Sequence, residues 1–276
     1  MTKLLITGGG GQLGQAFAAY QRTPVQRHAI EMMVLTRAEL DITSAASIQA
    51  VLQHSQARLV INAAAYTDVA RAELEPDKAY AVNVEGAALL AAHCAAADVD
   101  LIQLSTDYVF DGTKGAPYEV TDQVNPLNVY GHSKVAAEKA VMQEHPQAII
   151  VRTAWLYSEF GHNFQTKLLS AANSSLRLRV VDDEWGTPTK ASDLVRFLMR
   201  LSKNLVPYRG QRMHFAGEQV MSRWELAQQI VVEAFERGEL AMLPQIEAVK
   251  TSTQAKVVKR PLNSALKSSL LSSDGA

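Results

Sequence analysis

The chain has 276 residues, 47% of them hydrophobic, so it is long enough to bury a full core and too apolar to be disordered. Its 27 lysines and arginines nearly balance its 28 aspartates and glutamates, which excludes a global field that could hold nucleic acid or an anionic membrane. The single cysteine, Cys94, cannot form an internal disulfide, and the apolar run near residue 4 is too short for a signal sequence or a membrane span. We therefore expect a cytoplasmic protein with neither nucleic acid nor membrane as a partner, either a monomer or a homodimer.

The first half alternates short apolar runs with longer alanine-rich amphipathic segments, the pattern of βα units around a parallel sheet. We expect strands at residues 4–7, 33–35, 59–62, 101–105 and 148–152. Helices are expected at residues 12–20, 44–53, 77–97 (with room for a break) and 133–144. Parallel strands joined by helices require right-handed crossovers. The sequence therefore predicts an α/β fold, a Rossmann-like doubly wound parallel sheet with ligands at the carboxyl ends of its strands.

After residue 155 the pattern loosens, which predicts a smaller C-terminal substrate-binding lobe. We expect helices at 163–172, 192–202 and 222–237 and a short strand at 178–181. Residues 1–155 would form the NAD(P)-binding domain, including the helix that carries the catalytic pair. Residues 156–276 would mainly form the lobe, with some segments returning to the sheet. The polar tail after Arg260 is expected to fray.

A glycine-rich turn follows the first expected strand. Gly8 would permit a tight turn, Gly11 would let the backbone approach a pyrophosphate, and Gly14 would allow the helix to pack closely on the strand. The helix that follows offers unpaired N–H groups and a positive dipole end to phosphates. Because the strand before and the helix after match the context that the motif needs, we expect dinucleotide binding here, with Gln12 and Leu13 in the same turn.

The end of the second strand bears on the choice of cofactor. The residues there are Leu35, Thr36 and Arg37, where an acidic residue would bind the 2′-hydroxyl of NAD. No carboxylate stands there to repel a 2′-phosphate, and Arg37 could pair with one. This pattern favours NADPH and leaves NADH open as a second accepted cofactor.

Tyr130 and Lys134 are four residues apart, a spacing that places both on one face of a helix. An ammonium beside the phenol, together with a cationic nicotinamide, would lower the pKa of the tyrosine toward neutrality. Thr106 follows the strand at 101–105 and would hold a substrate oxygen beside Tyr130. These three residues predict proton exchange with a carbonyl or an alcohol.

Other strings in the chain are far more specific than a glycine turn. They are GQLG (11–14), ELDIT (39–43), NAAAYT (62–67), STDYVFDG (105–112), NPLNVYG (125–131), RTAWLY (152–157), GTPT (186–189) and RPLNS (260–264). Together they resemble the dTDP-4-dehydrorhamnose reductase family of the extended short-chain dehydrogenases/reductases. The resemblance runs from residue 3 to about residue 267, which is nearly the whole chain.

The resemblance implies an NAD(P)H-dependent reduction of C4 of dTDP-4-dehydro-L-rhamnose to dTDP-L-rhamnose, a precursor of cell-surface polysaccharides such as lipopolysaccharide O-antigen. Tyr130 would protonate the C4 oxygen, Lys134 would tune Tyr130 and hold the nicotinamide ribose, and Thr106 would position the carbonyl. The remaining cofactor contacts implied are Asp41, Ile42, Ala63, Ala64 and Ala65. The sugar pocket implied adds Asp107, Tyr108 and Trp155, of which the two aromatic residues could equally be ordinary packing.

Two departures from the family pattern stand out. Family members commonly carry an Asp-Lys pair after the NAAA segment, where this chain has Ala70 and Arg71. Some members also pair through a magnesium site built from glutamates, one of them just after the GTPT string. This chain has Ser192 and Asp193 there, and no acidic cluster near its C-terminus would complete the site. We therefore expect no metal ligands and doubt a role for magnesium.

Three other readings compete with this one. A dehydratase of the same superfamily would place an Asp-Glu pair after Thr106, whereas Asp107 is followed by Tyr108. A reductase that makes another 6-deoxyhexose, such as a talose or a pneumose, remains open, because the C4 configuration depends on the pocket. A non-catalytic nucleotide-binding regulatory subunit, such as that of methionine adenosyltransferase, also has this fold, although such a scaffold would not need the Thr106, Tyr130 and Lys134 set.

Overall fold

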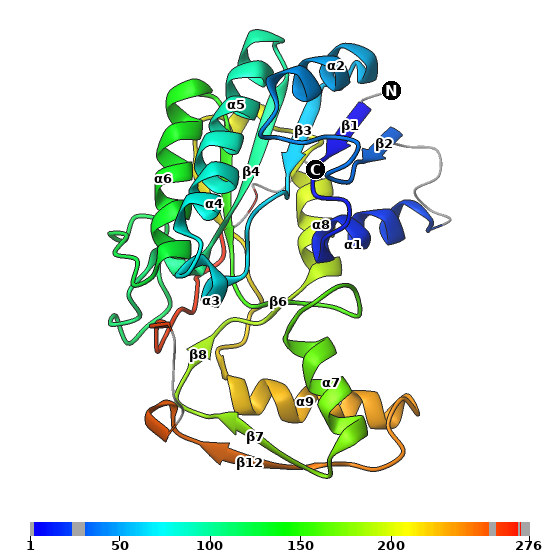
Figure 1. Cartoon of the computed structure of the whole chain (residues 1–276), viewed down its shortest axis with the longest axis vertical. Helices are drawn as coiled ribbons and strands as arrows, with labels where there is room; N and C mark the ends of the chain where they lie inside the picture. Colours follow the sequence, from blue (N-terminus) through cyan, green and yellow to red (C-terminus); the bar gives the residue numbers. More distant parts are fainter. Residues whose placement is uncertain (1–2, 24–30, 254–257, 270, 272–276) are drawn as a thin grey trace.

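A parallel sheet forms the centre of the molecule (Figure 1). The computed structural model describes residues 3–23, 31–253, 258–269 and 271, and within them the sheet has six strands in the order β10-β5-β4-β3-β1-β2. These strands are β1 (Lys3–Ile6), β2 (Glu31–Val34), β3 (Leu59–Asn62), β4 (Asp100–Thr106), β5 (Ile149–Thr153) and β10 (Arg212–His214). Every neighbouring pair is parallel, so all carboxyl ends meet along one edge. The strand order reverses beside β1, which is where such sheets bind their ligands.

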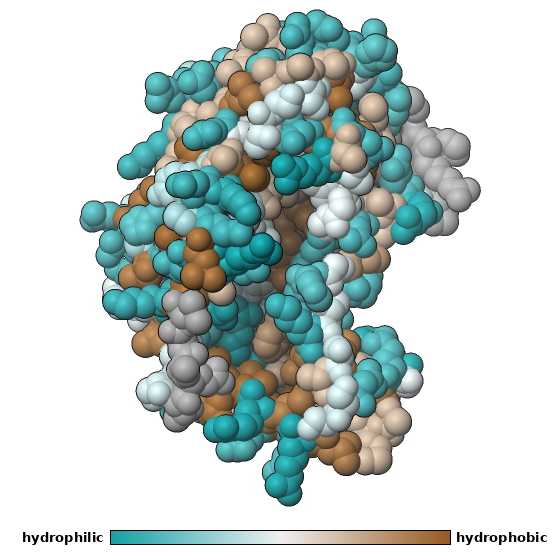
Figure 2. All heavy atoms as spheres, viewed as in Figure 1, coloured by the Kyte–Doolittle hydropathy of each residue, from teal (hydrophilic) through white to brown (hydrophobic). Residues whose placement is uncertain are grey.

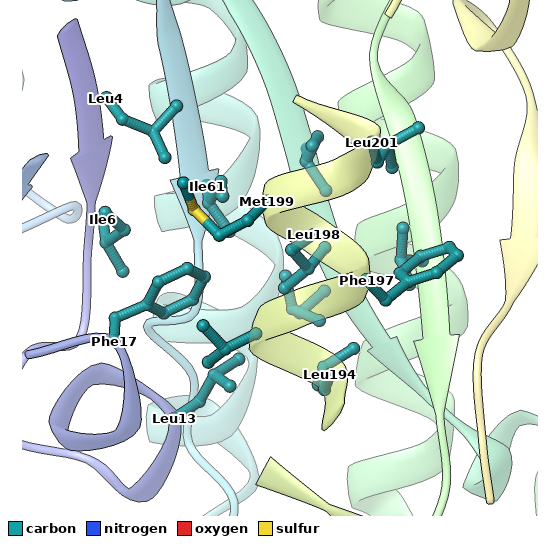
Figure 3. Packing of buried hydrophobic residues seen from close by; sticks show 14 of the residues in the cluster. Leu4, Ile6, Leu13, Phe17, Ile61, Leu194, Phe197, Leu198, Met199 and Leu201 are labelled. Carbon is teal, nitrogen blue, oxygen red and sulfur yellow. The ribbon is translucent and has the colours of Figure 1, made fainter. Parts of the chain in front are cut away.

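Helices cover both faces of the sheet, because its apolar strands alternate their side chains between the two sides. Leu4 and Ile6 of β1 pack with Phe17 and Leu198 on one face (Figure 3), whereas Leu5 packs on the other. The helices concerned are α1 (Gln12–Gln21) and α8 (Ala191–Leu201) on the first face, and α2 (Ala45–Ser55), α5 (Ala87–Ala96) and α6 (Val129–Glu144) on the second. The expected doubly wound fold is confirmed.

The second half of the chain builds a smaller lobe below the carboxyl edge of the sheet (Figure 1). Its elements are β7 (Arg177–Val181), β12 (Gln245–Val249), α7 (Phe164–Ser174) and α9 (Arg223–Glu236). The strand β7 pairs in parallel with β12, and α7 and α9 pack on them around Leu168, Leu178 and Ile230. Two short pairs tie the lobe together, β6 (Leu156–Tyr157) with β9 (Thr189–Lys190) and β8 (Trp185–Gly186) with β11 (Met221–Ser222). The chain leaves the sheet after β5 but returns to it with α8 and β10, and a domain boundary at residue 155 remains our proposal.

Several expected boundaries move. The helix expected at 77–97 comprises α4 (Pro76–Tyr80), a π-helical turn (Ala81–Gly86) and α5, and a short α3 (Val69–Ala72) precedes it. The helix α6 begins at Val129, four residues earlier than expected, because the Asn128 side chain caps it by accepting from the Gly131 N–H. The strands β10 and β12 were missed, since a run of three to five residues with mixed polarity carries little periodic signal.

The expectation that the chain frays after Arg260 is wrong for the described residues beyond it. Ala265 and Leu266 are buried, and the Tyr118 N–H donates to the Ala265 carbonyl at 2.7 Å. This polar stretch is ordered because it lies across the main body as an extended strap with paired backbone groups. In the part of the chain that the structure describes, no helix combines the length and the apolar character needed to cross a bilayer.

Candidate active site

A cleft of about 1040 Å³ lies between the carboxyl edge of the sheet and the lobe. Figure 2 shows the surface hollowed there, between the upper and lower parts of the molecule. Its sheet side is formed by the turn after β1, the segment after β3, the end of β4 and the start of α6. Its lobe side is formed by the β6 to α7 connection, β7 and the first residue of α9. The volume is at the upper end for a small-molecule site, which suits two ligands held together.

The glycine turn has the geometry expected for it. Gly8 has φ of +71°, and a Cβ there would lie 2.8 Å from the Ala63 carbonyl oxygen. A Cβ at Gly14 would lie 2.5 Å from the Gly8 carbonyl oxygen, so the first turn of α1 can pack on the loop only without one. Gly11 is the N-cap of α1, and it has no side chain that could accept a hydrogen bond from the unpaired N–H groups of the helix. These groups face the cleft and suit a phosphate.

Other residues expected to contact the cofactor line the same wall. Gln12, Leu13 and residues 63–65 border the cleft beside the glycine turn. The Gln12 Nε2 atom is buried and has no hydrogen-bond partner among the described residues. A buried donor without a partner is costly, so this amide favours an acceptor supplied by a ligand.

The residues expected at the adenosine end lie apart from this cleft. Thr36, Arg37, Asp41 and Ile42 are not among its lining, and Ile42 is buried in the core under Gly86. The Arg37 side chain is 78% exposed and its Nε lies 3.5 Å from the Asp41 carboxylate. These four residues follow β2 and lie beside the glycine turn, where the adenosine of a dinucleotide bound in the cleft would extend.

The expectation that no carboxylate stands at the end of β2 is wrong. The Glu39 carboxylate folds back to accept from both the backbone N–H (2.8 Å) and the hydroxyl (2.7 Å) of Thr36. These hydrogen bonds hold the pKa of Glu39 below its ordinary value, so it is charged. Sequence position alone placed Glu39 in the next segment, and only the turn of the chain brings it back.

The three expected catalytic residues meet at the carboxyl end of β4. Thr106 ends the strand, and its hydroxyl lies next to the Tyr130 phenol from α6. The same hydroxyl donates to the Asp107 carboxylate at 3.0 Å and accepts from the Tyr108 N–H at 3.2 Å. Thr106, Tyr130 and Lys134 all border the cleft, although each residue is less than a tenth exposed. A substrate oxygen between Thr106 and Tyr130 would have two hydroxyl groups to meet it.

The expectation that Lys134 and a bound nicotinamide together lower the pKa of Tyr130 stays a prediction, because the structure holds no cofactor. Without it, burial raises the pKa of Tyr130 above its ordinary value, and the nearby Thr106 hydroxyl only partly opposes this. The Lys134 ammonium instead donates to the Leu104 carbonyl at 2.8 Å. Burial lowers the pKa of Lys134 to about 8, against the field of Glu138 one helical turn further on. The phenol therefore keeps its proton, which is the form needed to donate one.

The end of the cleft that faces the lobe holds the residues expected for the sugar. Asp107 is buried, and one of its carboxylate oxygens has no hydrogen-bond partner in the described structure. Burial raises the pKa of Asp107 to about 6, against the opposing effects of the nearby Ser264 and Thr106 hydroxyl groups. Tyr108 packs edge-on against the Tyr130 ring, with centroids 5.8 Å apart. A polar ligand group could satisfy the open oxygen of Asp107.

Trp155 has φ of +44°, a left-handed conformation that non-glycine residues rarely adopt. Its indole ring lies against Gly186, where a Cβ would meet the ring at 2.3 Å, and its Nε1 donates to the Ser264 hydroxyl at 3.2 Å. The guanidinium of Arg223 stacks over the ring at 3.5 Å. Backbone strain held by this many contacts is typical of a functional position.

Sequence reasoning missed two features of the site and its surroundings. The first is Arg223 at the start of α9, which lines the cleft with Arg260 and Lys167 and gives its lobe side a cationic character. No local pattern marks Arg223, although Arg260 belongs to the RPLNS string. The second is Asn83 in the π-helical turn. Its side-chain oxygen accepts from the Tyr66 N–H, and its side-chain nitrogen donates to the Tyr66 carbonyl and, at 2.9 Å, to the Ser133 hydroxyl.

The two departures from the family pattern also have structural counterparts. Ala70 borders the cleft, so the missing carboxylate leaves that wall apolar. Among the described residues, no group of three or more histidines, cysteines or carboxylates could hold a metal ion. The absence of magnesium stays a prediction.

Comparisons with known proteins agree on one family. The family model described as "RmlD substrate binding domain" matches residues 1–276. A dTDP-4-dehydrorhamnose reductase of Aggregatibacter actinomycetemcomitans is 37% identical over 96% of this chain and 90% of its own length. The enzyme of the same name from Mycobacterium tuberculosis is 42% identical over 84% of this chain and 75% of its own. A crystal structure of the Bacillus anthracis reductase in complex with NADP superposes with a TM-score of 0.87 at 30% identity, covering 98% of this chain and 92% of that one.

Proposed function

Because the chain belongs to the RmlD family of dTDP-4-dehydrorhamnose reductases, we propose that it reduces the C4 keto group of dTDP-4-dehydro-L-rhamnose to give dTDP-L-rhamnose, using NADPH. It is an oxidoreductase of the extended short-chain dehydrogenase/reductase kind. The observation that carries the proposal is the meeting of Thr106, Tyr130 and Lys134 at the carboxyl end of β4, on the wall of the large cleft.

The residues on the sheet side fit a dinucleotide. The turn packs tightly without a Cβ at Gly8 and Gly14, and Gly10 and Gly11 line the cleft without side chains, so backbone N–H groups can approach a pyrophosphate. Gln12 adds an amide nitrogen without a partner among the described residues. Lys134 would hold the ribose of the nicotinamide, and residues 63–65 would run along the cofactor. When bound, NADPH supplies a hydride to the carbonyl carbon of the substrate.

The side chains then complete the reduction. As the C4 oxygen gains negative charge, the Thr106 hydroxyl donates a hydrogen bond to it and Tyr130 transfers its phenolic proton, so the carbonyl becomes an alcohol. Burial raises the pKa of Tyr130, so the phenol still carries its proton when the C4 oxygen becomes basic enough to take it. The Lys134 ammonium stabilises the resulting phenolate, which regains a proton from water. Exclusion of water by the lobe strengthens each of these interactions.

The lobe side of the cleft fits a nucleotide sugar. Asp107 and Trp155 would contact the hexose, since an open carboxylate oxygen can accept from a sugar hydroxyl and an indole can pack on its apolar face. The positive charge of Arg223, Arg260 and Lys167 would favour the diphosphate. The reading as a dehydratase gains no support, because the residue after Asp107 is the aromatic Tyr108 packed on Tyr130.

A turnover assay tests the proposal. The protein is mixed with NADPH and freshly made dTDP-4-dehydro-L-rhamnose, the loss of absorbance at about 340 nm is followed, and proton couplings in the NMR spectrum of the product report the configuration at C4. Catalytic oxidation with the rhamno configuration supports the proposal. Another configuration would assign the chain to a different 6-deoxyhexose, and stoichiometric binding without turnover would make it a regulatory subunit.

Two further properties belong to this proposal. We place the reaction in the cytoplasm, since the single cysteine, Cys94, is buried as a free thiol in α5, as suits a reducing compartment. The substrate and the cofactor are the only partners that the reaction needs, and the protein would act as a monomer or a homodimer.

A further inference from the structure

Three polar side chains form a row across the centre of the sheet, on the face that α6 covers. Thr7 follows β1, Asn62 ends β3 and Gln103 lies beside Asn62 in β4, all of them at most 1% exposed. The neighbouring positions on this face, Leu5 and Val60, belong to the apolar core. Buried polar groups cost stability unless they are fully paired, and apolar residues would serve the core equally well. Their presence calls for a reason other than stability.

The row is hydrogen-bonded in one direction. The Thr7 hydroxyl accepts a hydrogen bond from the Ala64 N–H at 3.0 Å and donates its own proton to the Asn62 Oδ1 at 2.6 Å. The Asn62 Nδ2 must then face Gln103, and it donates to the Gln103 Oε1 at 2.7 Å. This leaves the Gln103 Nε2 to donate onward, and it does so to the Leu104 carbonyl at 2.9 Å. The orientation of each amide therefore follows from the one before it.

The row ends on the atom that holds the catalytic lysine. The Leu104 carbonyl also accepts from the Lys134 Nζ at 2.8 Å, and a carbonyl oxygen has two acceptor sites. Gln103 occupies one of them, so the ammonium is confined to the other. Lys134 keeps two further N–H donors for groups in the cleft, in directions set by that first bond.

We propose that Gln103 is a positioning residue for Lys134, which it ties through Asn62 and Thr7 to the phosphate-binding turn. The same row that orders the residues beside Gly8 thus orders the lysine that meets the far end of the cofactor. The proposal rests on the proposed function for its kinetic consequences, but the contact itself can be tested without the sugar nucleotide.

The experiment compares two variants of Gln103 with a control. Gln103→Met keeps the length of the side chain and removes both hydrogen bonds. Gln103→Glu keeps an acceptor for Asn62 but turns a carboxylate toward the ammonium. The control, His145→Leu, removes a buried hydrogen bond of 3.0 Å to the Val99 carbonyl beside the opposite end of β4. All three should lower the melting temperature, which shows the cost of losing a buried polar contact.

Only the Gln103 variants should change the chemistry. We expect Gln103→Met to lower kcat about tenfold, with the KM for the sugar nucleotide within about twofold, because a misplaced lysine affects the reacting centre more than substrate capture. The control should keep the wild-type kcat. Wild-type kinetics in Gln103→Met, or an equal loss of kcat in the His145→Leu control, would overturn the proposal. Either result would show that Gln103 only contributes to stability.

The charge of Lys134 gives the second readout. Labelling with acetic anhydride at a series of pH values, followed by mass spectrometry of the peptide, measures the pKa of Lys134 without any substrate. The charged group that faces Lys134 is Glu138, which is itself paired with Arg152 and Arg212, and Tyr130 lies one turn before it. Gln103→Glu should raise the Lys134 midpoint by about one pH unit, because a new carboxylate favours the ammonium.

An unchanged midpoint in Gln103→Glu would refute the contact, and this variant also serves if Gln103→Met does not fold. If the wild-type protein failed to turn over the sugar nucleotide while the midpoint still shifted, the proposed function would fall and the positioning contact would stand.

Discussion

Replacing Tyr130 by phenylalanine isolates the proton transfer, because it removes one oxygen atom and leaves the ring. That ring still packs against Tyr108, and the Thr106 hydroxyl keeps Asp107 as its acceptor and the Tyr108 N–H as its donor. Loss of the phenol oxygen should cost about 1 kcal/mol of stability at most, a small share of the total for a domain of this size. A positioned general acid contributes about 10² to 10⁴ in rate, or roughly 3 to 5 kcal/mol of barrier. Turnover should thus nearly vanish while fold and NADPH affinity survive.

The assay follows oxidation of NADPH at saturating sugar nucleotide, with the cofactor deuterated at the transferred position. A deuterium isotope effect shows that hydride transfer limits the rate, and quenching of protein fluorescence gives the NADPH affinity. Lys134→Met is the informative comparison. It removes the ammonium that stabilises the phenolate and a donor to the ribose, so cofactor affinity and rate should both fall.

The reasoning fails if Tyr130→Phe retains more than about a tenth of the wild-type turnover while the isotope effect shows that chemistry is rate-limiting. Another group would then supply the proton. The dinucleotide fold and the family membership do not depend on this result.

Four further outcomes test the rest of the site. Arg37→Ala should weaken NADPH by about tenfold, or about 1 to 2 kcal/mol, and NADH hardly at all, since its proposed contact is to the 2′-phosphate; equal losses in a titration would remove that contact. Treatment with a chelator should leave turnover and sedimentation unchanged, and activity that only magnesium restores would reveal a metal site. Trp155→Ala should raise the KM for the sugar nucleotide with NADPH binding intact, whereas weaker NADPH binding would place Trp155 on the cofactor wall. Because burial raises the pKa of Asp107 from 3.8 to about 6, the folded state binds this proton more tightly than the unfolded state does. The free energy of unfolding should therefore fall by about 2 kcal/mol as pH rises from 4 to 6, and Asp107→Asn should remove that slope in urea titrations; parallel pH profiles would contradict it.

The sequence by itself determined the features that depend on neighbouring residues. Alternating apolar runs such as Leu4 to Ile6 decide which faces of a strand are buried, and Gly8 and Gly14 are needed wherever a Cβ would meet backbone. The spacing of Tyr130 and Lys134 puts both on one side of α6 whatever surrounds the helix. These rules act over a few residues, so the doubly wound fold, the tight glycine turn after β1 and the placement of Tyr130 and Lys134 on one helix were all predictable.

Only the tertiary structure decided what those residues touch. The direction in which the pKa of Tyr130 moves depends on its burial by several elements, and Lys134 is held by a carbonyl thirty residues away rather than by the tyrosine. The Glu39 carboxylate reaches Thr36 through a turn, and Arg223 enters the cleft from the far end of the chain. Such contacts join segments that no local periodicity relates, and desolvation sums over every atom nearby. They are set only when the strands, the helices and the lobe pack together.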